Sequence, residues 1–147
     1  MAPEEIVDFL LHGTRTGKLA FVAADGAARV TPIWFVLDDE AEPGPTGLPD
    51  LLFNTGMATA KGRAMRRDPR VTLLVDDDTP PFALVRIQGE VELSEDVELS
   101  RFWATRIGAR YMGADRAEEF GRRNGVPGEY LVRLRPTTVT SEAGVAD

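Results

Sequence analysis

The chain consists largely of short strand-like runs, most of which follow one another with few helices between them. The segment KLAFVAADGAARVTPIWFVLD, residues 18–38, contains two such runs on either side of Asp25-Gly26, a strong signal for a two-residue β-hairpin. Four further runs follow at residues 51–55, 70–76, 82–94 and 129–140. A parallel sheet would need a crossover helix between most of these runs. We therefore predict a mainly β protein of the α+β class, in which six antiparallel strands close into a small barrel with peripheral helices.

The remaining segments predict short helices around this barrel. Apolar residues at helical spacing, or a helix stop such as Asp68-Pro69, indicate helices over residues 3–11, 59–67, 97–108 and 115–124. Gly89 interrupts a long strand run, which predicts a bulge or a sharp bend. The stretch over 39–50 is rich in proline, glycine and acid, but it is too short to separate two cores. We therefore expect a single domain over residues 1–147.

Composition narrows the chemistry that the chain can carry. It has no cysteine and a single histidine, His12, so thiolate chemistry is excluded and we expect no metal site. A net charge of −7 argues against nucleic acid, whose binding needs a broad basic surface. No apolar run is long enough to span a membrane and no signal peptide is evident, so we expect a cytoplasmic protein without a membrane partner. If the protein is an enzyme, a bound cofactor must supply most of the reactivity.

Positive charge is concentrated at one place in this acidic chain. Five of its seventeen Lys and Arg residues fall between positions 59 and 70, behind a threonine at the expected start of a helix. The Thr59 hydroxyl can cap the free backbone N–H groups there, or share them with a bound anion. Lys61 in the first turn is unfavourable beside the positive end of the helix dipole unless an anion is present. Two interpretations stay open: a phosphate site, or a lysine that extends into water.

A second unusual stretch is RVTPIWF, residues 29–35. A proline within a strand removes a hydrogen-bond donor and belongs at a sheet edge or a bulge, so Pro32 marks backbone that is open to something other than a neighbouring strand. Trp34 lies two residues further on and faces the same side as Pro32. This arrangement suits a flat heteroaromatic ring, but a core tryptophan on an edge strand explains the pattern equally well.

Together these stretches carry a resemblance to a known family. The order of a DG hairpin, RVTPIWF, LLFNTGMATAKGRAMRRDPRVTLLV and IQGEVELS resembles the flavin-reductase-like split β-barrel of the pyridoxamine-phosphate-oxidase superfamily over about residues 17–139, and most closely its branch that uses the deazaflavin coenzyme F420. The resemblance implies a homodimer with cofactor sites at the subunit interface, and hydride transfer from reduced coenzyme F420 to a small planar unsaturated acceptor. The cofactor-binding residues that it implies are Thr31, Pro32, Ile33 and Trp34 at the ring, Asn54 and Thr55 near the ribityl chain, and Thr59, Ala60 and Lys61 at the phosphate.

The sequence departs from the FMN-binding members of the superfamily at two points. They usually pair the phosphate lysine with an adjacent arginine, where this chain has Ala60, and the C-terminal Arg-x-His motif for a substrate phosphate is missing. The deazaflavin branch is therefore the better match, with an FMN enzyme or a non-catalytic deazaflavin carrier as the alternatives. No catalytic residue is assigned, although Tyr111 is the one candidate for a proton donor. Three arginines of the later helices could meet the acidic tail of the cofactor or form a solvated helix face: Arg101, Arg106 and Arg110.

Overall fold

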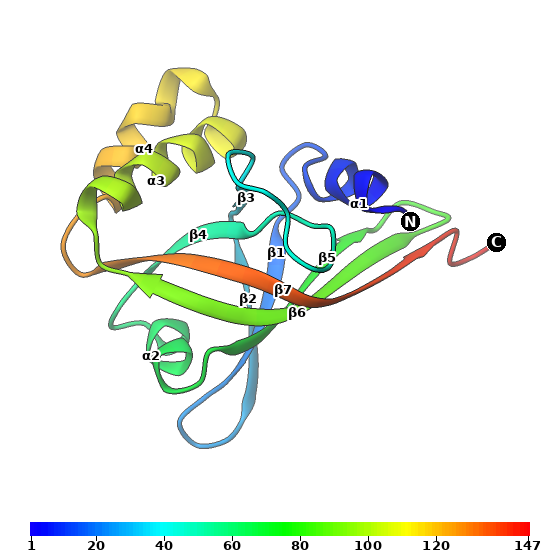
Figure 1. Ribbon diagram of the computed structural model, residues 1–147, viewed down its shortest axis with the longest axis horizontal. Coiled ribbons are helices and arrows are strands. Elements are labelled where there is room, and N and C mark those ends of the chain that lie inside the picture. The colour runs from blue at the N-terminus through cyan, green and yellow to red at the C-terminus, as the bar shows by residue number, and fades with distance from the viewer.

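The computed structural model describes residues 1–147 as one antiparallel sheet of seven strands with four α-helices (Figure 1). The strands are β1 (Gly17–Val22), β2 (Ala28–Ile33), β3 (Val36–Leu37), β4 (Leu51–Gly56), β5 (Arg70–Asp77), β6 (Ala83–Ser94) and β7 (Glu129–Ala143). The helices are α1 (Pro3–Leu10), α2 (Ala60–Arg67), α3 (Val97–Met112), the short 3-10 helix η1 (Ala114–Arg116) and α4 (Ala117–Asn124). The strand order is β2-β1-β5-β6-β7-β4-β3. The predicted class, a mainly β curled sheet with peripheral helices, is confirmed, with seven strands where the sequence predicted six.

The additional strand arises because the second strand of the DG hairpin is divided in two. β2 ends at Ile33 and pairs with β1, whereas β3 begins at Val36 and pairs with β4. These strands are the two ends of the strand order, so the residues between them, Trp34 and Phe35, connect the two edges of the curled sheet. This dipeptide is named the crossover below. Phe35 is 0% exposed inside the core and Trp34 is 37% exposed, because neighbouring side chains of extended backbone point in opposite directions.

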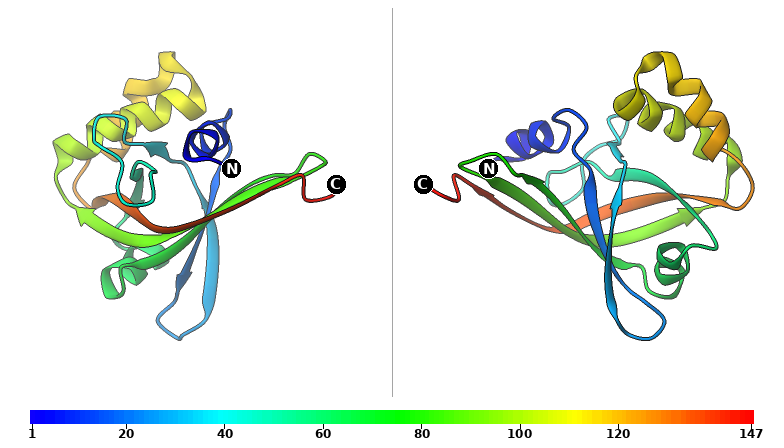
Figure 2. Two further views of the ribbon diagram at one scale, coloured as in Figure 1. Left: turned by 45° about the vertical axis from the view of Figure 1, so that its right-hand side comes forward. Right: turned by 180° about the vertical axis from the view of Figure 1, so that it is seen from behind.

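The main core fills the inside of the curl. It contains 18 buried side chains, most of them from the strands. α1 and α2 lie at opposite ends of the curl (Figures 1 and 2), where they add Ile6, Leu10 and Met65 to this core. α3 and α4 pack outside the sheet, where Trp103 forms a smaller cluster with side chains of β4 and β7. None of the helices is both long enough and apolar enough to cross a lipid bilayer.

Two local predictions about strands are confirmed. Pro32 lies on β2, which is an edge strand, so its missing N–H removes no bond to a second neighbour. The register of β6 against β7 shifts between Gln88 and Gly89, although the extra residue, Thr137, lies on β7 rather than beside the glycine on β6. Glycine is required at position 89 because a Cβ there would lie 2.3 Å from the carbonyl oxygen of Arg135.

α3 is one turn longer than predicted, and this difference shapes the site. Gly108 is where the sequence pattern ends, but its role is to allow close packing, since a Cβ there would lie 2.7 Å from the Cβ of Phe120 on α4. The helix continues to Met112 and stops before Gly113, whose φ of 95° favours glycine. The additional turn carries Arg110 and Tyr111.

Candidate functional site

The aromatic ring of Trp34 is held by side chains from α3 and α4. It stacks on Tyr111 with ring centroids 5.1 Å apart and planes inclined by 7°, and it meets Phe120 at 5.7 Å and 57°. Such offset and tilted pairs are favourable arrangements of aromatic rings. The indole is therefore not a mobile surface group, even though part of it is exposed.

The backbone of the crossover is fixed by the last turn of α3. The Arg110 guanidinium donates hydrogen bonds to the carbonyl oxygens of Phe35 and Leu10, both at 2.7 Å. The Tyr111 hydroxyl donates to the carbonyl oxygen of Arg15 at 2.8 Å and accepts from the Phe35 N–H at 3.2 Å. These two side chains tie together the end of α1, the approach to β1 and the crossover, and they are named the clamp below.

These bonds decide what the clamp residues do. Every bond that Arg110 makes goes to a backbone carbonyl, so this arginine belongs neither to a solvated helix face nor to a site for an acidic tail. Burial lowers the pKa of Arg110, and burial raises the pKa of Tyr111. The Tyr111 proton is committed to a backbone carbonyl, so the candidate proton donor is a positioning residue in this structure.

The other two later-helix arginines differ from each other. Arg106 donates to Asp39 and Glu40, each at 2.8 Å, and thereby holds the loop over residues 38–50 against α3. Arg101 is exposed and forms no ion pair. Of the three arginines considered for an acidic tail, Arg101 alone keeps a free charged group.

A cavity of about 220 Å³ lies beside Trp34 and is named the ring cavity. Five of the nine predicted cofactor-binding residues line it, together with one residue from α3 and one from α4. The lining residues are Pro32, Ile33, Trp34, Asn54, Lys61, Ile107 and Asn124. The structure thus brings the tryptophan and the lysine, which are far apart in the sequence, to one cavity.

Asn54 lines this cavity and has an unpaired acceptor atom. Its Nδ2 donates to the Ser100 hydroxyl at 2.9 Å, and that hydroxyl donates to the Asn124 carbonyl oxygen at 3.4 Å. This chain of bonds fixes which end of the amide is the donor. The Asn54 Oδ1 atom is buried and has no hydrogen-bond partner. An unpaired buried acceptor is costly in a folded protein, so it points to a ligand donor at this position.

Thr59 and Thr55 act on the start of α2 instead of lining the cavity. The Thr59 hydroxyl accepts from the Gly62 N–H at 3.1 Å, as predicted for a helix N-cap, and donates to the Gly56 carbonyl oxygen at 2.8 Å. The buried Thr55 hydroxyl lies 3.1 Å from that of Thr59. Both hydroxyls are therefore occupied in shaping the turn that presents Lys61.

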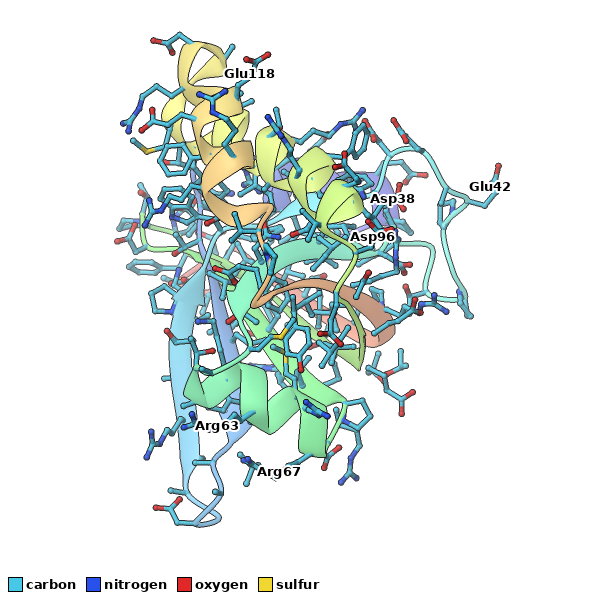
Figure 3. The ribbon with its side chains drawn as sticks, turned by 90° about the vertical axis from the view of Figure 1, so that its left-hand side faces the viewer. Asp38, Glu42, Arg63, Arg67, Asp96 and Glu118 are labelled. Atoms are coloured by element: carbon cyan, nitrogen blue, oxygen red, sulfur yellow. The ribbon has the colours of Figure 1, made fainter.

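Lys61 has no partner of its own. It lines the ring cavity and forms no ion pair or side-chain hydrogen bond, and α2 has no acidic residue in its first turn. A second cavity of about 240 Å³, the basic cavity, lies along the same helix and is lined by Ala23, Ala24, Asp25, Arg29, Ala60, Arg63 and Arg67. Its three arginines form no ion pairs either. Figure 3 shows Arg63 and Arg67 on α2 beside the end of the β1–β2 hairpin.

The four predicted cofactor-binding residues that do not line the ring cavity lie elsewhere around α2 and β2. Ala60 lines the basic cavity, whereas Thr31, which pairs with Leu19 of β1, lines neither cavity. Sequence reasoning missed Ile107 and Asn124, which come from helices whose packing on the crossover has no local signal. It also missed Arg29, which two-residue alternation from Thr31 could have suggested. No group of three or more His, Asp and Glu side chains comes together to hold a metal ion.

Comparison with known proteins identifies the family. The sequence model described as pyridoxamine 5'-phosphate oxidase matches residues 2–142, and the chain belongs to this family. Its members are typically oxidoreductases, and the fold binds flavin-type cofactors. No curated protein matches the chain significantly.

Solved structures share the fold over nearly the whole chain. A conserved hypothetical protein from Mycobacterium tuberculosis is 26% identical, with a TM-score of 0.80 over 98% of this chain and 86% of that chain. A protein described as an F420 reductase is also 26% identical, with a TM-score of 0.65 over 90% of this chain and 94% of that chain. An FAD-binding protein from Mesorhizobium loti, 20% identical, shows the fold alone, with a TM-score of 0.65 over 96% of this chain and 92% of that chain.

The clamp generates a stability prediction. Tyr111→Phe keeps the ring that stacks on Trp34 but removes the hydroxyl that bridges Arg15 and Phe35. We expect the free energy of unfolding to fall by about 1–2 kcal/mol, because two half-buried backbone groups lose a partner. Urea denaturation measures this change, and Tyr130→Phe is the matched control because the Tyr130 hydroxyl makes no hydrogen bond in the protein. Equal effects of the two substitutions would contradict the role of the clamp.

Proposed function

We propose that the protein is a coenzyme F420-dependent oxidoreductase, in which the reduced deazaflavin donates a hydride to a planar unsaturated acceptor. One observation carries the proposal: a single cavity is lined by Trp34, by Lys61, which has no ion pair, and by Asn54, whose buried carbonyl oxygen has no partner. A ligand with a flat ring, a hydroxylated chain and a phosphate would suit these three residues in turn: the ring suits Trp34, the hydroxyls suit Asn54 and the phosphate suits Lys61. The family and the likeness to a protein described as an F420 reductase support the same conclusion.

The residues present fit such a cofactor. Pro32, Ile33 and Trp34 would hold the ring, and Asn54 would accept a hydrogen bond from the ribityl hydroxyls. Lys61 and the first backbone N–H groups of α2 would hold the phosphate. Thr59 and Thr55 order that turn, Ala60 contributes its backbone, and Thr31 contributes only through the backbone of β2. When bound, reduced coenzyme F420 supplies the hydride.

The chain itself binds, orients and excludes water. The clamp fixes Trp34, and the α3–α4 pair adds Ile107 and Asn124 as a wall of the cavity. No carboxyl, imidazole or thiol group is part of the cavity lining, so we assign no proton donor and expect solvent to protonate the product. The protein's part in catalysis is therefore placement and electrostatics, which is the usual division of labour in a cofactor enzyme.

FMN is the alternative cofactor, and a non-catalytic deazaflavin carrier is the alternative role. Ala60 adds no charge to the phosphate position, which favours the less highly charged phosphate of the deazaflavin over that of FMN. A carrier would bind coenzyme F420 but show no turnover with quinone-like, enone or tetrapyrrole acceptors. Turnover with any of them separates the enzyme from the carrier.

We further propose that the protein is a homodimer, as the resemblance implies. The outward side of β1 and β2 carries a strip of small apolar side chains, in which Val22 and Val30 are 62% and 67% exposed. Part of this strip lines a hollow of about 470 Å³, together with residues of β5, β6 and β7. It is larger than the ring cavity but has neither an unpaired buried polar atom nor a stacked aromatic ring. Exposed apolar surface of this kind marks a protein–protein contact.

The dimer can be tested by light scattering at micromolar concentration. We expect the unsubstituted protein to have twice the mass of the chain and Val30→Glu to have the mass of one chain, because a charge in the apolar strip opposes its burial. Val126→Glu, at an exposed apolar position after α4, is the control and should leave the dimer intact. A monomeric unsubstituted protein would overturn this part of the proposal.

Lys61→Ala tests the cofactor site. Isothermal titration calorimetry of the apoprotein with coenzyme F420 should show affinity lower by about 10- to 100-fold, because a charge-assisted bond of roughly 1.5–3 kcal/mol is lost. The unfolding free energy should hardly change, since Lys61 has no ion pair and opposes the helix dipole. Arg66→Ala is the matched control, an exposed arginine on the same helix that lines neither cavity. If both variants bind equally weakly, a diffuse positive field and not a phosphate site holds the ligand.

A further inference from the structure

Glu129 lies at the foot of the helix that presents Lys61. It is the first residue of β7 and pairs with Gly56, the last residue of β4. Its Oε2 atom lies 3.8 Å from the point that a Cβ on Gly56 would occupy, and the methyl group of Thr59 lies 3.2 Å from the same point. The carboxyl group therefore lies beside the turn that leads into α2. No pattern in the sequence indicated this position.

The surroundings of Glu129 are unusual for a carboxylate. Its Oε2 atom is buried and has no hydrogen-bond partner. The charged groups that act on it are Lys61 from α2 and Arg123 from α4, neither of which forms an ion pair with it, and β4 supplies no charged residue. Burial raises the pKa of Glu129, and this effect outweighs the two cations. Neighbouring groups thus stabilise the charged form of Glu129 only weakly.

We propose that Glu129 makes the Lys61 subsite select a phosphodiester over a phosphomonoester. The inference rests on the proposed function, because it takes Lys61 as the phosphate-binding residue. A phosphodiester carries one negative charge, whereas a monoester carries close to two at neutral pH. A carboxylate beside the lysine repels the second charge, so it disfavours the phosphate of FMN more than the diester phosphate of coenzyme F420.

The same arrangement couples binding to a proton. A phosphate placed at Lys61 adds negative charge near Glu129, which favours the neutral carboxylic acid and raises its pKa in the complex. Binding therefore takes up a proton, and affinity for a phosphate ligand rises as pH falls toward that pKa. With glutamine at position 129 the repulsion and this contribution to the pH dependence are both lost.

The test compares FMN with riboflavin, which lacks the phosphate, in the full-length apoprotein at pH 8. We expect Glu129→Gln to raise the affinity for FMN by about 10-fold and the affinity for riboflavin by less than about 2-fold, because only FMN carries the phosphate that the Glu129 carboxylate repels. The affinity for coenzyme F420 should rise by a smaller factor than the affinity for FMN. Glu118→Gln, which removes the same charge from an exposed position on α4, is the control and should change none of the affinities. Equal changes for FMN and riboflavin, or weaker FMN binding, would overturn the proposal.

A second arm uses inorganic phosphate, and its outcome does not depend on any flavin. Thermal unfolding in phosphate is compared with unfolding in chloride at equal ionic strength. The proposal predicts that phosphate raises the melting temperature of Glu129→Gln more than that of the unsubstituted protein, and an equal rise in both would contradict it. If coenzyme F420 fails to bind while this difference is present, the proposed function is wrong but the role of Glu129 stands.

Discussion

The site depends on how the two edges of the curled sheet are joined. The crossover of Trp34 and Phe35 is too short to be held by strand pairing, so its backbone groups are bonded by Arg110 and Tyr111 of α3 instead. Phe35 then fills the core while Trp34 turns outward against the Tyr111 ring. One clamp thereby links the stability of the core to the orientation of the aromatic group that faces the ring cavity.

The surroundings of α2 are rich in positive charge, although the composition of the whole chain is acidic. The chain is acidic overall, yet Lys61 faces one cavity and three arginines face another, all without ion pairs. The carboxyl group of Glu129, whose pKa is influenced by Lys61, lies beside the turn before this helix and comes from β7. A generally positive surface would bind any phosphate. The cations without ion pairs, combined with one carboxyl group whose charged form few neighbours stabilise, would instead make this site selective between phosphates of different charge.

Most of the fold could be predicted from the sequence alone, because the strongest signals in the sequence are local. The turn at Asp25-Gly26, the Thr59 N-cap and the edge position of Pro32 depend on a few neighbouring residues, although the hairpin leaves residues 23–27 outside the strands where a two-residue loop was predicted. The division of the second hairpin strand could not be predicted, since β3 pairs with β4 across a long loop. For the same reason Asn124 and Glu129 were missed: the α3–α4 packing and the β4–β7 register bring them to the site.

In the proposed complex the Trp34 ring would lie against the ring of the bound deazaflavin. The chain has two tryptophans, so Trp103→Phe leaves Trp34 as the sole indole reporter. Titration of this variant with coenzyme F420, followed by tryptophan emission and in parallel by calorimetry, shows whether the cofactor ring meets Trp34. We expect the emission to fall and to saturate at the calorimetric stoichiometry, and FMN to require a higher concentration for the same decrease. Calorimetric binding of coenzyme F420 with unchanged Trp34 emission would contradict this expectation.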